Sequence, residues 1–441
     1  MEANWSMNIV VAFATGIAIY IGRLLFKRWF NPLSVYSALW GFCLFNYELR
    51  LIQYYPISTA AWMYIGAAWV TLYLGAAAVL LASPWTRQPS PVQLGVDLNR
   101  LKKGVLFLSV VGAAGVIGQV IAVTRSFGSP IAALFLNPGD IYNARISNEL
   151  SGLPYAGSFS LAACTLAGAH VAKSGKFTFA TFLPIVLVGV QLAFLMGRGA
   201  LGIGAILFLV TALHTPRDPG AKAPRWQLIV GAVLVATILG GVFALVSAIR
   251  GLGVNYPGNT PALDRISEYV PVAPSLYSNF SGTPVAFSMY LSTPEANKHG
   301  FWGMYTFAPV LRLLSKFGFP TGVPPYEEDY WTPVPMNTST YLKNLYSDFG
   351  PAGILVFPFI LGAAATLLIL RVKTKPRLLD LVLLANIYVL IVFSFSYNFM
   401  LSGDWYIAAL ASVLAAIAVE YRSVVGRARH APHLARLKPN V

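Results

Sequence analysis

The chain has 441 residues, of which 56% are hydrophobic and only 11% are charged, and its mean hydropathy is +0.64. This composition excludes a soluble protein, because too few charged side chains remain to cover a water-exposed surface. A formal net charge of +15 would indicate a nucleic-acid partner in a soluble protein, but the placement of the basic residues along this chain has another explanation.

Apolar runs of about 20 residues recur along the sequence, and each can cross the ~30 Å hydrocarbon core of a bilayer. No small-residue cleavage pattern follows the first run, so we interpret it as a retained helix and not as a cleaved signal. The sequence predicts an all-α polytopic integral membrane protein, forming a single transmembrane domain over 1–441. About eleven spans are predicted, at 7–25, 33–52, 59–83, 104–124, 155–172, 178–196, 199–214, 227–249, 351–371, 380–400 and 404–421.

Basic residues concentrate in the connections that follow the odd-numbered spans and in the C-terminal tail. These segments hold 21 of the 31 Lys and Arg residues but only four acids. Because basic residues mark the cytoplasmic side, the N-terminus is predicted outside and the C-terminus inside. The positive charge is thus a topology signal, with the basic tail against anionic membrane lipid, and we expect no nucleic-acid partner.

Two outer connections, 125–154 and 250–350, are too long to be simple turns. Loops of this length are usually functional or disordered, and the many Tyr and Trp residues of 250–350 argue against disorder. The segment "MYTFAPVLRLLSKFG" has an amphipathic pattern. We therefore expect short helices at the membrane surface, which form a lid over a cavity on the outer face.

Arginines on the outer side are the candidate anion-binding residues, because the positive-inside rule disfavours them there. Arg198 lies between glycines in "FLMGRGALGIG", at the junction of two spans, where a guanidinium needs an anionic partner or a water-filled cavity. Arg250 ends the eighth span and Arg265 follows in the large loop. Arginine suits bidentate phosphate recognition, although each of these residues also fits an interfacial anchor or a surface ion pair.

Candidate proton acceptors on the outer side are His299 and the acids of "PPYEEDYW", which include Glu327. The acids equally fit a solvated surface, and their spacing matches no metal-ligand pattern. Cys43 and Cys164 lie inside apolar runs, so neither a disulfide nor a metal site is predicted from them. No nucleotide-binding glycine motif is present on the cytoplasmic side, which argues against a cytosolic nucleotide donor.

Three segments together resemble the bacterial oligosaccharide repeat-unit polymerases, the Wzy-type O-antigen polymerase family. They are "FNPLSVYSALWGFCLFNYELRL", "GRGALGIGAILFLV" and "YLKNLYSDFGPAGILVFPFILG", and the last is the most specific. By position, Arg198 resembles the arginine after the family's short turn, and Tyr346, Asp348 and Gly350 match its late loop motif. Arg145 resembles the arginine of another family loop, which a glycine closes about eleven positions later. In this chain Ala156 stands at that position and the glycine, Gly157, follows one residue later.

The resemblance implies a GT-C-like, metal-independent glycosyltransferase of the inner membrane with its N-terminus in the periplasm and no cofactor. Such an enzyme moves a growing chain from undecaprenyl diphosphate onto the next lipid-linked repeat, in lipopolysaccharide or another surface polysaccharide. A chain-length regulator and a flippase are implied as further partners. We expect a base among His299, Glu327 and Asp348 beside Tyr346, and a diphosphate site formed by Arg198, Arg250, Arg265, Arg312 and Arg145.

Two other functions remain open from the residues alone. An O-antigen ligase shares the topology and the donor but transfers glycan to lipid A-core. A lipid-linked oligosaccharide flippase or other transporter would need charged residues along a transmembrane route, whereas most charge here lies in the outer loops. A non-catalytic assembly partner is disfavoured by the set of outer arginines.

Overall fold

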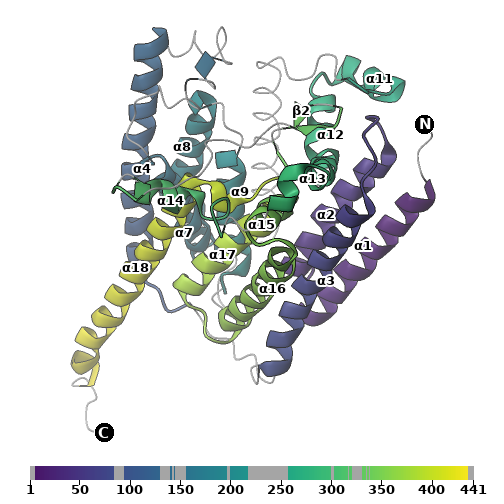
Figure 1. The fold of residues 1–441 in the computed structure, drawn as a ribbon. Coiled ribbons are helices and arrows are strands. Elements are labelled where there is room, and N and C mark those ends of the chain that lie inside the picture. The colour runs from purple at the N-terminus through teal and green to yellow at the C-terminus, as the bar shows by residue number, and fades with distance from the viewer. Residues whose placement is uncertain are drawn as a thin grey trace. The chain divides into compact units, whose positions relative to one another are not determined.

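The computed structural model describes residues 5–83, 94–129, 140–141, 144, 155–195, 199–216, 257–298, 302–315, 317–319, 330–333, 335–336 and 338–435. The helices and strands are labelled in Figure 1, and the chain divides into two compact units. The first unit comprises Met1–Ser83, Ala244–Leu367 and Ile387–Gly403. The second comprises Pro84–Phe243, Leu368–Asn386 and Asp404–Val441.

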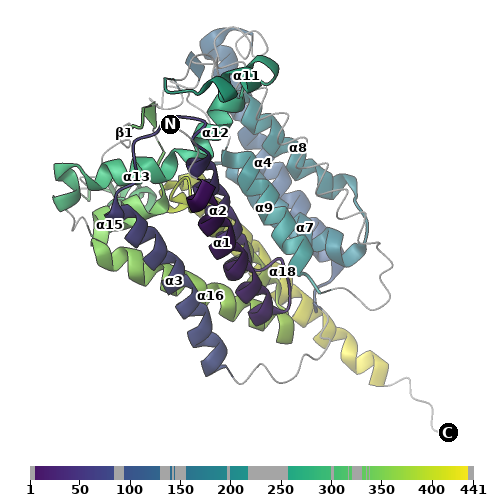
Figure 2. The same cartoon turned by 90° about the vertical axis from the view of Figure 1, so that its right-hand side faces the viewer.

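The first unit contains the long apolar helices α1 (Trp5–Phe26), α2 (Pro32–Leu49) and α3 (Thr59–Ala82), and the start of α16 (Pro351–Thr374) (Figure 2). Helices α3 and α16 approach each other through two glycines. A Cβ on Gly75 would lie 2.0 Å from the Phe359 carbonyl oxygen, and one on Gly362 would lie 2.0 Å from that of Leu72. Such close backbone contact through small residues is typical of helices that pack within a membrane.

Short elements fill much of the long segment between α9 and α16. They are α11 (Pro261–Tyr269), α12 (Ala273–Ser281), α13 (Thr283–Leu291), the 3₁₀ helix η2 (Pro294–Lys298), α14 (Ala308–Ser315), the strands β1 (Tyr330–Trp331) and β2 (Pro335–Met336), and α15 (Tyr341–Phe349). The two strands pair antiparallel. Helix α13 contacts α3, β1 and α15, and lies beside α15 in both views (Figures 1 and 2). The expected short helices are present, while their place at a membrane surface stays a prediction.

The connection between α2 and α3 joins the membrane helices to these short elements. The predicted span 33–52 is too long, because α2 ends at Leu49 and Arg50 takes the left-handed conformation at φ 52°. Ile52 then pairs with Asn259 and is buried against Leu263 and Tyr277. The predicted end of this span at residue 52 was wrong because the apolar side chain of Ile52 is buried against protein and not against lipid.

The second unit is built from α4 (Leu98–Phe127), α7 (Ser158–Ser174), α8 (Phe179–Leu195) and α9 (Gly199–His214) with α18 (Gly403–Ala435). Helix α7 is the centre, buried at every residue over 160–172, and it contacts α4, α8 and α9. Close approach again depends on glycine. A Cβ on Gly115 of α4 would lie 2.2 Å from the Gly157 nitrogen at the start of α7.

Ten of the eleven predicted spans coincide with helices, and the eleventh, 227–249, lies outside the described residues. In the described part of the chain, five helices are long and apolar enough to cross a membrane, namely Ser6–Phe26, Thr59–Ala82, Leu98–Phe127, Pro351–Thr374 and Gly403–Tyr421. Three shorter apolar helices are Phe179–Leu192, Gly199–His214 and Leu378–Phe393 (α17).

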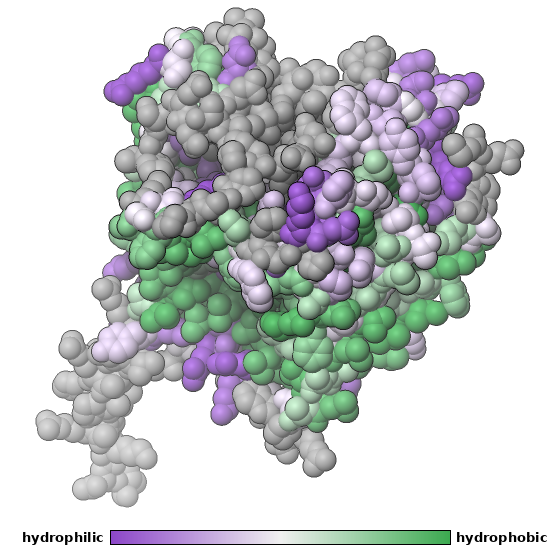
Figure 3. Space-filling view, viewed as in Figure 1, coloured by the Kyte–Doolittle hydropathy of each residue, from purple (hydrophilic) through white to green (hydrophobic). Residues whose placement is uncertain are grey.

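Within the first unit, apolar side chains gather over α16 and its neighbours, and paler and polar ones lie over the short helices (Figure 3). The all-α membrane class is therefore confirmed. The count of eleven spans, the membrane orientation and the GT-C-like arrangement stay predictions.

Candidate functional site

Helix α15 has two different faces, and both carry residues that the sequence singled out. Lys343, Tyr346 and Ser347 are spaced three and four residues apart, so they share one face. Tyr341 and Asp348 lie on the opposite face. The helix is short, but it is held firmly because Tyr341, Leu342, Leu345, Ser347 and Asp348 are all buried.

The first face of α15 forms a tyrosine–lysine cluster, which we define as Tyr64, Tyr290, Tyr330, Lys343 and Tyr346. The Tyr346 ring centroid lies 5.4 Å from that of Tyr64 and 6.3 Å from that of Tyr290. The Tyr290 and Tyr330 centroids are 6.3 Å apart. These residues come from α3, α13, β1 and α15, so the cluster joins four segments that are distant in sequence.

Lys343 is the cation of this cluster and its side chain is only 4% exposed. Its Nζ lies 4.8 Å from the Tyr330 ring centroid and 5.6 Å from that of Tyr290. Aromatic faces attract an ammonium group at this range, which helps to hold the charge in a buried place. The Tyr290 hydroxyl and Ser347 Oγ share a hydrogen bond of 2.7 Å, which fixes the ring against α15.

Tyr346 differs from Tyr290 because it is only half-buried. Burial, with a smaller contribution from the hydrogen bond and proximity of Tyr64, raises the pKa of Tyr346 to about 12. A tyrosine hydroxyl keeps its proton at neutral pH, and can donate a hydrogen bond, even at its usual pKa of 10, and the raised pKa extends this to higher pH. A donor of this kind can stabilise negative charge on oxygen but cannot act as a base.

The opposite face of α15 uses Asp348 to hold a distant loop. The fully buried carboxylate accepts a hydrogen bond from the Tyr305 nitrogen at 3.0 Å and another from the Thr306 nitrogen at 2.6 Å. The Asp348 carbonyl oxygen also accepts from the Trp302 nitrogen at 3.2 Å. Both carboxylate oxygens are engaged with backbone, so this geometry favours a positioning role over the predicted role as a base.

The residues that follow Asp348 make an abrupt turn into α16. Gly350 has φ 61° and ψ −152°, a conformation that is essentially restricted to glycine, and Pro351 then begins the membrane helix. Gly353 lies so close to α15 that a Cβ there would be 2.4 Å from the Leu345 carbonyl oxygen. The motif "DFGPAG" is thus explained as a loop anchor followed by a tight helix-to-helix turn.

The structure describes two of the other predicted site residues, Arg265 and Arg312. Arg265 and Arg312 are exposed on α11 and α14, and neither makes a contact in the tyrosine–lysine cluster that the described distances show. Five predicted residues lie outside the described part of the chain, namely His299, Glu327, Arg145, Arg198 and Arg250. Their assignments stay predictions.

Sequence reasoning did not predict that Lys343, Tyr64, Tyr290 and Tyr330 gather around Tyr346. One signal was available, since Lys343 precedes Tyr346 by three residues and must share its helical face. The tyrosines of α3, α13 and β1 gave no local signal, because only the tertiary fold brings them to α15.

The second unit contains a different polar site, which we call the amide cluster and define as Gln119, Ser158, Ser160, Gln191 and Asp404. Ser158 Oγ donates to Asp404 Oδ1 at 2.6 Å. A Cβ on Gly157 would lie 2.8 Å from Gln191 Nε2 and 3.3 Å from Gln119 Nε2, so both amides lie at the start of α7. Among the described residues, Gln119 Oε1, Gln191 Oε1 and Ser160 Oγ are buried without a hydrogen-bond partner.

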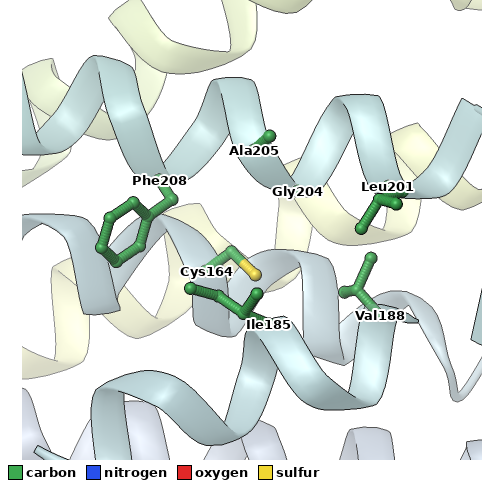
Figure 4. Close-up of a pocket in the computed structure, with 7 residues that line it drawn as sticks. All are labelled: Cys164, Ile185, Val188, Leu201, Gly204, Ala205 and Phe208. Carbon is green, nitrogen blue, oxygen red and sulfur yellow. The ribbon is translucent and has the colours of Figure 1, made fainter. Parts of the chain in front are cut away.

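A narrow pocket also lies between α7, α8 and α9 in this unit (Figure 4). It is lined by Cys164, Ile185, Val188, Leu201, Gly204, Ala205 and Phe208. These side chains offer packing and a buried thiol, so the pocket is poorly suited to recognise a charged or hydroxylated substrate. Within the described ranges, no three His, Cys, Asp or Glu residues gather as a metal ion would require.

No protein-family model, curated protein or solved structure matches this chain. The tyrosine–lysine cluster is therefore interpreted from its own chemistry. Tyr64, Tyr330 and Tyr346 are half-buried, and tyrosine rings can stack on sugar rings, hydroxyl groups can bond to sugar oxygens, and an ammonium group can attract phosphate.

Proposed function

We propose that this protein polymerises lipid-linked oligosaccharide repeat units at the periplasmic face of a bacterial inner membrane. The observation that carries the proposal is the tyrosine–lysine cluster, which forms around one face of α15, the helix that leads directly into the membrane helix α16. A lipid-linked glycan presents sugars and a diphosphate just outside the bilayer. Aromatic rings with a buried lysine at the entry of a membrane helix suit both parts of such a substrate.

The proposed reaction transfers the growing chain from its undecaprenyl diphosphate carrier to the incoming lipid-linked repeat. The acceptor hydroxyl oxygen forms a bond to the anomeric carbon, and the bond from that carbon to the diphosphate oxygen breaks. The diphosphate leaves with the electron pair, and a base takes the hydroxyl proton. His299 and Glu327 remain the proposed bases, because the carboxylate of Asp348 is engaged by two backbone N–H groups.

Cations and donors near the leaving group would offset its developing charge, as preorganised electrostatic groups do in other enzymes. We assign Lys343 and the Tyr346 hydroxyl to this role. Arg198, Arg250, Arg265, Arg312 and Arg145 remain proposed diphosphate ligands. In this scheme the protein's cations supply the charge that a divalent metal would otherwise provide.

The test is synthesis of polymer by the purified protein in lipid nanodiscs, with lipid-linked repeats as the substrate and EDTA present. A ladder of lengthened lipid-linked products is expected. Lys343→Met should lower the rate about tenfold or more, equivalent to ~1.4 kcal/mol of transition-state stabilisation. Lys298→Met is the matched control, since Lys298 is an exposed lysine of η2.

The same assay separates the alternatives. Product found only after lipid A-core is added would indicate the ligase and contradict the polymerase. The transport alternative needs sealed liposomes, in which movement of lipid-linked repeats across the membrane without lengthening would indicate a flippase. A ladder that is unchanged by Lys343→Met would keep the polymerase but remove the tyrosine–lysine cluster from its mechanism.

A further inference from the structure

The helix α14 and the residues that flank it expose an apolar surface outside the candidate site. Val310, Leu313 and Leu314 are 40%, 55% and 38% exposed, although all three are apolar. They are spaced three and four residues apart, which places them on one face of the helix. Arg312 and Ser315 lie on the opposite face, and Ala308 is buried. Helix α14 is thus amphipathic, with its apolar face turned outward.

Exposed aromatic side chains flank the helix in the chain on both sides. Trp302 and Phe307, before the helix, are 86% and 42% exposed. Phe317 and Phe319, after it, are 73% and 59% exposed, and both donate backbone hydrogen bonds to the Leu314 carbonyl oxygen. An apolar face bordered by Trp and Phe is the pattern of helices that lie in a membrane interface.

Asp348 fixes where this helix lies relative to a membrane span in the same unit. Through its carboxylate and its carbonyl oxygen it binds the backbone of Trp302, Tyr305 and Thr306. The Phe307 nitrogen then donates to the Gly303 oxygen at 2.7 Å, so the anchored turn continues directly into α14. Asp348 itself is three residues before Pro351, where the apolar helix α16 begins.

From this geometry we propose that α14 lies in the lipid interface, with Val310, Leu313 and Leu314 in the acyl-chain region. The partner is bilayer lipid, because the helix is tied to the end of a membrane span. Its apolar face is therefore held at the level where that span enters the bilayer. Arg312 and Ser315 lie on the side that faces away from the acyl chains. Helix α14 thus acts as a membrane-bound strap for α15, since Asp348 joins the two.

Site-directed spin labelling in lipid nanodiscs tests this placement. Single variants Leu313→Cys and Leu314→Cys place a nitroxide on the apolar face, and Ser315→Cys is the matched control on the opposite face of the same helix. Phe317→Cys supplies an independent position if one helix variant fails to fold. The native Cys43 and Cys164 are fully buried, and labelling of the parent protein measures their contribution.

Accessibility to oxygen, which concentrates in hydrocarbon, is compared with accessibility to a water-soluble nickel chelate. At Leu313, Leu314 and Phe317 we expect oxygen to dominate, and at Ser315 we expect the nickel chelate to dominate. Dominance of the nickel chelate at the three apolar positions would place the helix in water and overturn the proposal. Low accessibility to both reagents would show a protein contact and also overturn it. The test measures lipid contact and not polymer synthesis, so its outcome is independent of the proposed function.

Discussion

The tyrosine–lysine cluster of the first unit and the amide cluster of the second unit accommodate polar side chains inside an apolar protein in different ways. In the first, the cation lies against two aromatic rings, and Tyr346 is half-buried. In the second, two amide oxygens and a serine hydroxyl are buried at the start of a closely packed helix. The cation–aromatic contact holds a positive charge in a buried place, whereas the amide cluster borders closely packed helices whose contacts depend on small residues.

The two clusters also differ in how the surrounding elements are held together. Apart from α3, the elements around the tyrosine–lysine cluster are short, and specific hydrogen bonds hold them, such as those of Asp348 and Ser347. The helices around the amide cluster are longer, and backbone contact at Gly115 sets their spacing. A substitution should therefore act through lost hydrogen bonds in the first unit and through steric overlap in the second.

The largest effect is expected from Asp348→Ala, which removes the acceptor of two buried N–H groups. Hydrogen bonds to a charged group contribute about 1.5–3 kcal/mol each, so the loss should lower the unfolding midpoint strongly. Asp348→Asn should give a smaller loss, because one amide oxygen can still accept while the NH₂ group opposes the second donor. Thermal unfolding in detergent provides the measurement.

Asp264→Ala is the control for the two Asp348 variants, because Asp264 is an exposed acid of α11. The free energy of unfolding of Asp264→Ala should stay within about 0.5 kcal/mol of that of the parent protein. Equal midpoints for Asp348→Ala and Asp264→Ala would contradict the anchoring role of Asp348.

Asp348 also shows what sequence can and cannot reveal in this protein. Hydropathy located ten helices, and aromatic content predicted ordered short elements in 250–350, because both depend on local composition. The motif around Asp348 was correctly placed at the entry of a membrane helix. Its hydrogen-bond partners Tyr305 and Thr306, however, lie 43 and 42 residues earlier, and only the fold reveals them. The tyrosine–lysine cluster was missed for the same reason.

The next effect should come from Gly115→Ala in the second unit. The added Cβ would lie 2.2 Å from the Gly157 nitrogen, so the helices must separate, and such overpacking costs about 1–3 kcal/mol. Gly189→Ala is the matched control, since its Cβ would meet no atom within 4 Å. If both variants unfold at the same midpoint, close packing at the start of α7 is not what stabilises this unit.

A smaller, pH-dependent effect is expected from Tyr346→Phe. Tyr346 has a pKa of about 12 in the folded protein, above the usual value of 10. The unfolded chain therefore releases this proton first as the pH rises, and stability is lost between about pH 10 and 12. Tyr346→Phe should flatten that decline in the unfolding midpoint, whereas Tyr269→Phe, at a side chain 86% exposed, should leave the decline in place. An identical decline in both variants would contradict a buried Tyr346 hydroxyl.

The smallest effect on stability is expected from Arg265→Gln, because Arg265 is exposed on α11 and surface substitutions usually stay within ±0.5 kcal/mol. Its effect on substrate is the informative measurement, since a proposed phosphate ligand should weaken binding of lipid-linked repeats without moving the unfolding midpoint. Arg100→Gln in the second unit is the comparison, because Arg100 pairs with Asp97 at 3.6 Å. Affinity that falls for Arg265→Gln alone would extend the substrate site from the tyrosine–lysine cluster to α11. Equal affinity in both variants would remove Arg265 from the diphosphate ligands and leave Lys343 and Arg312 as the proposed cations among the described residues.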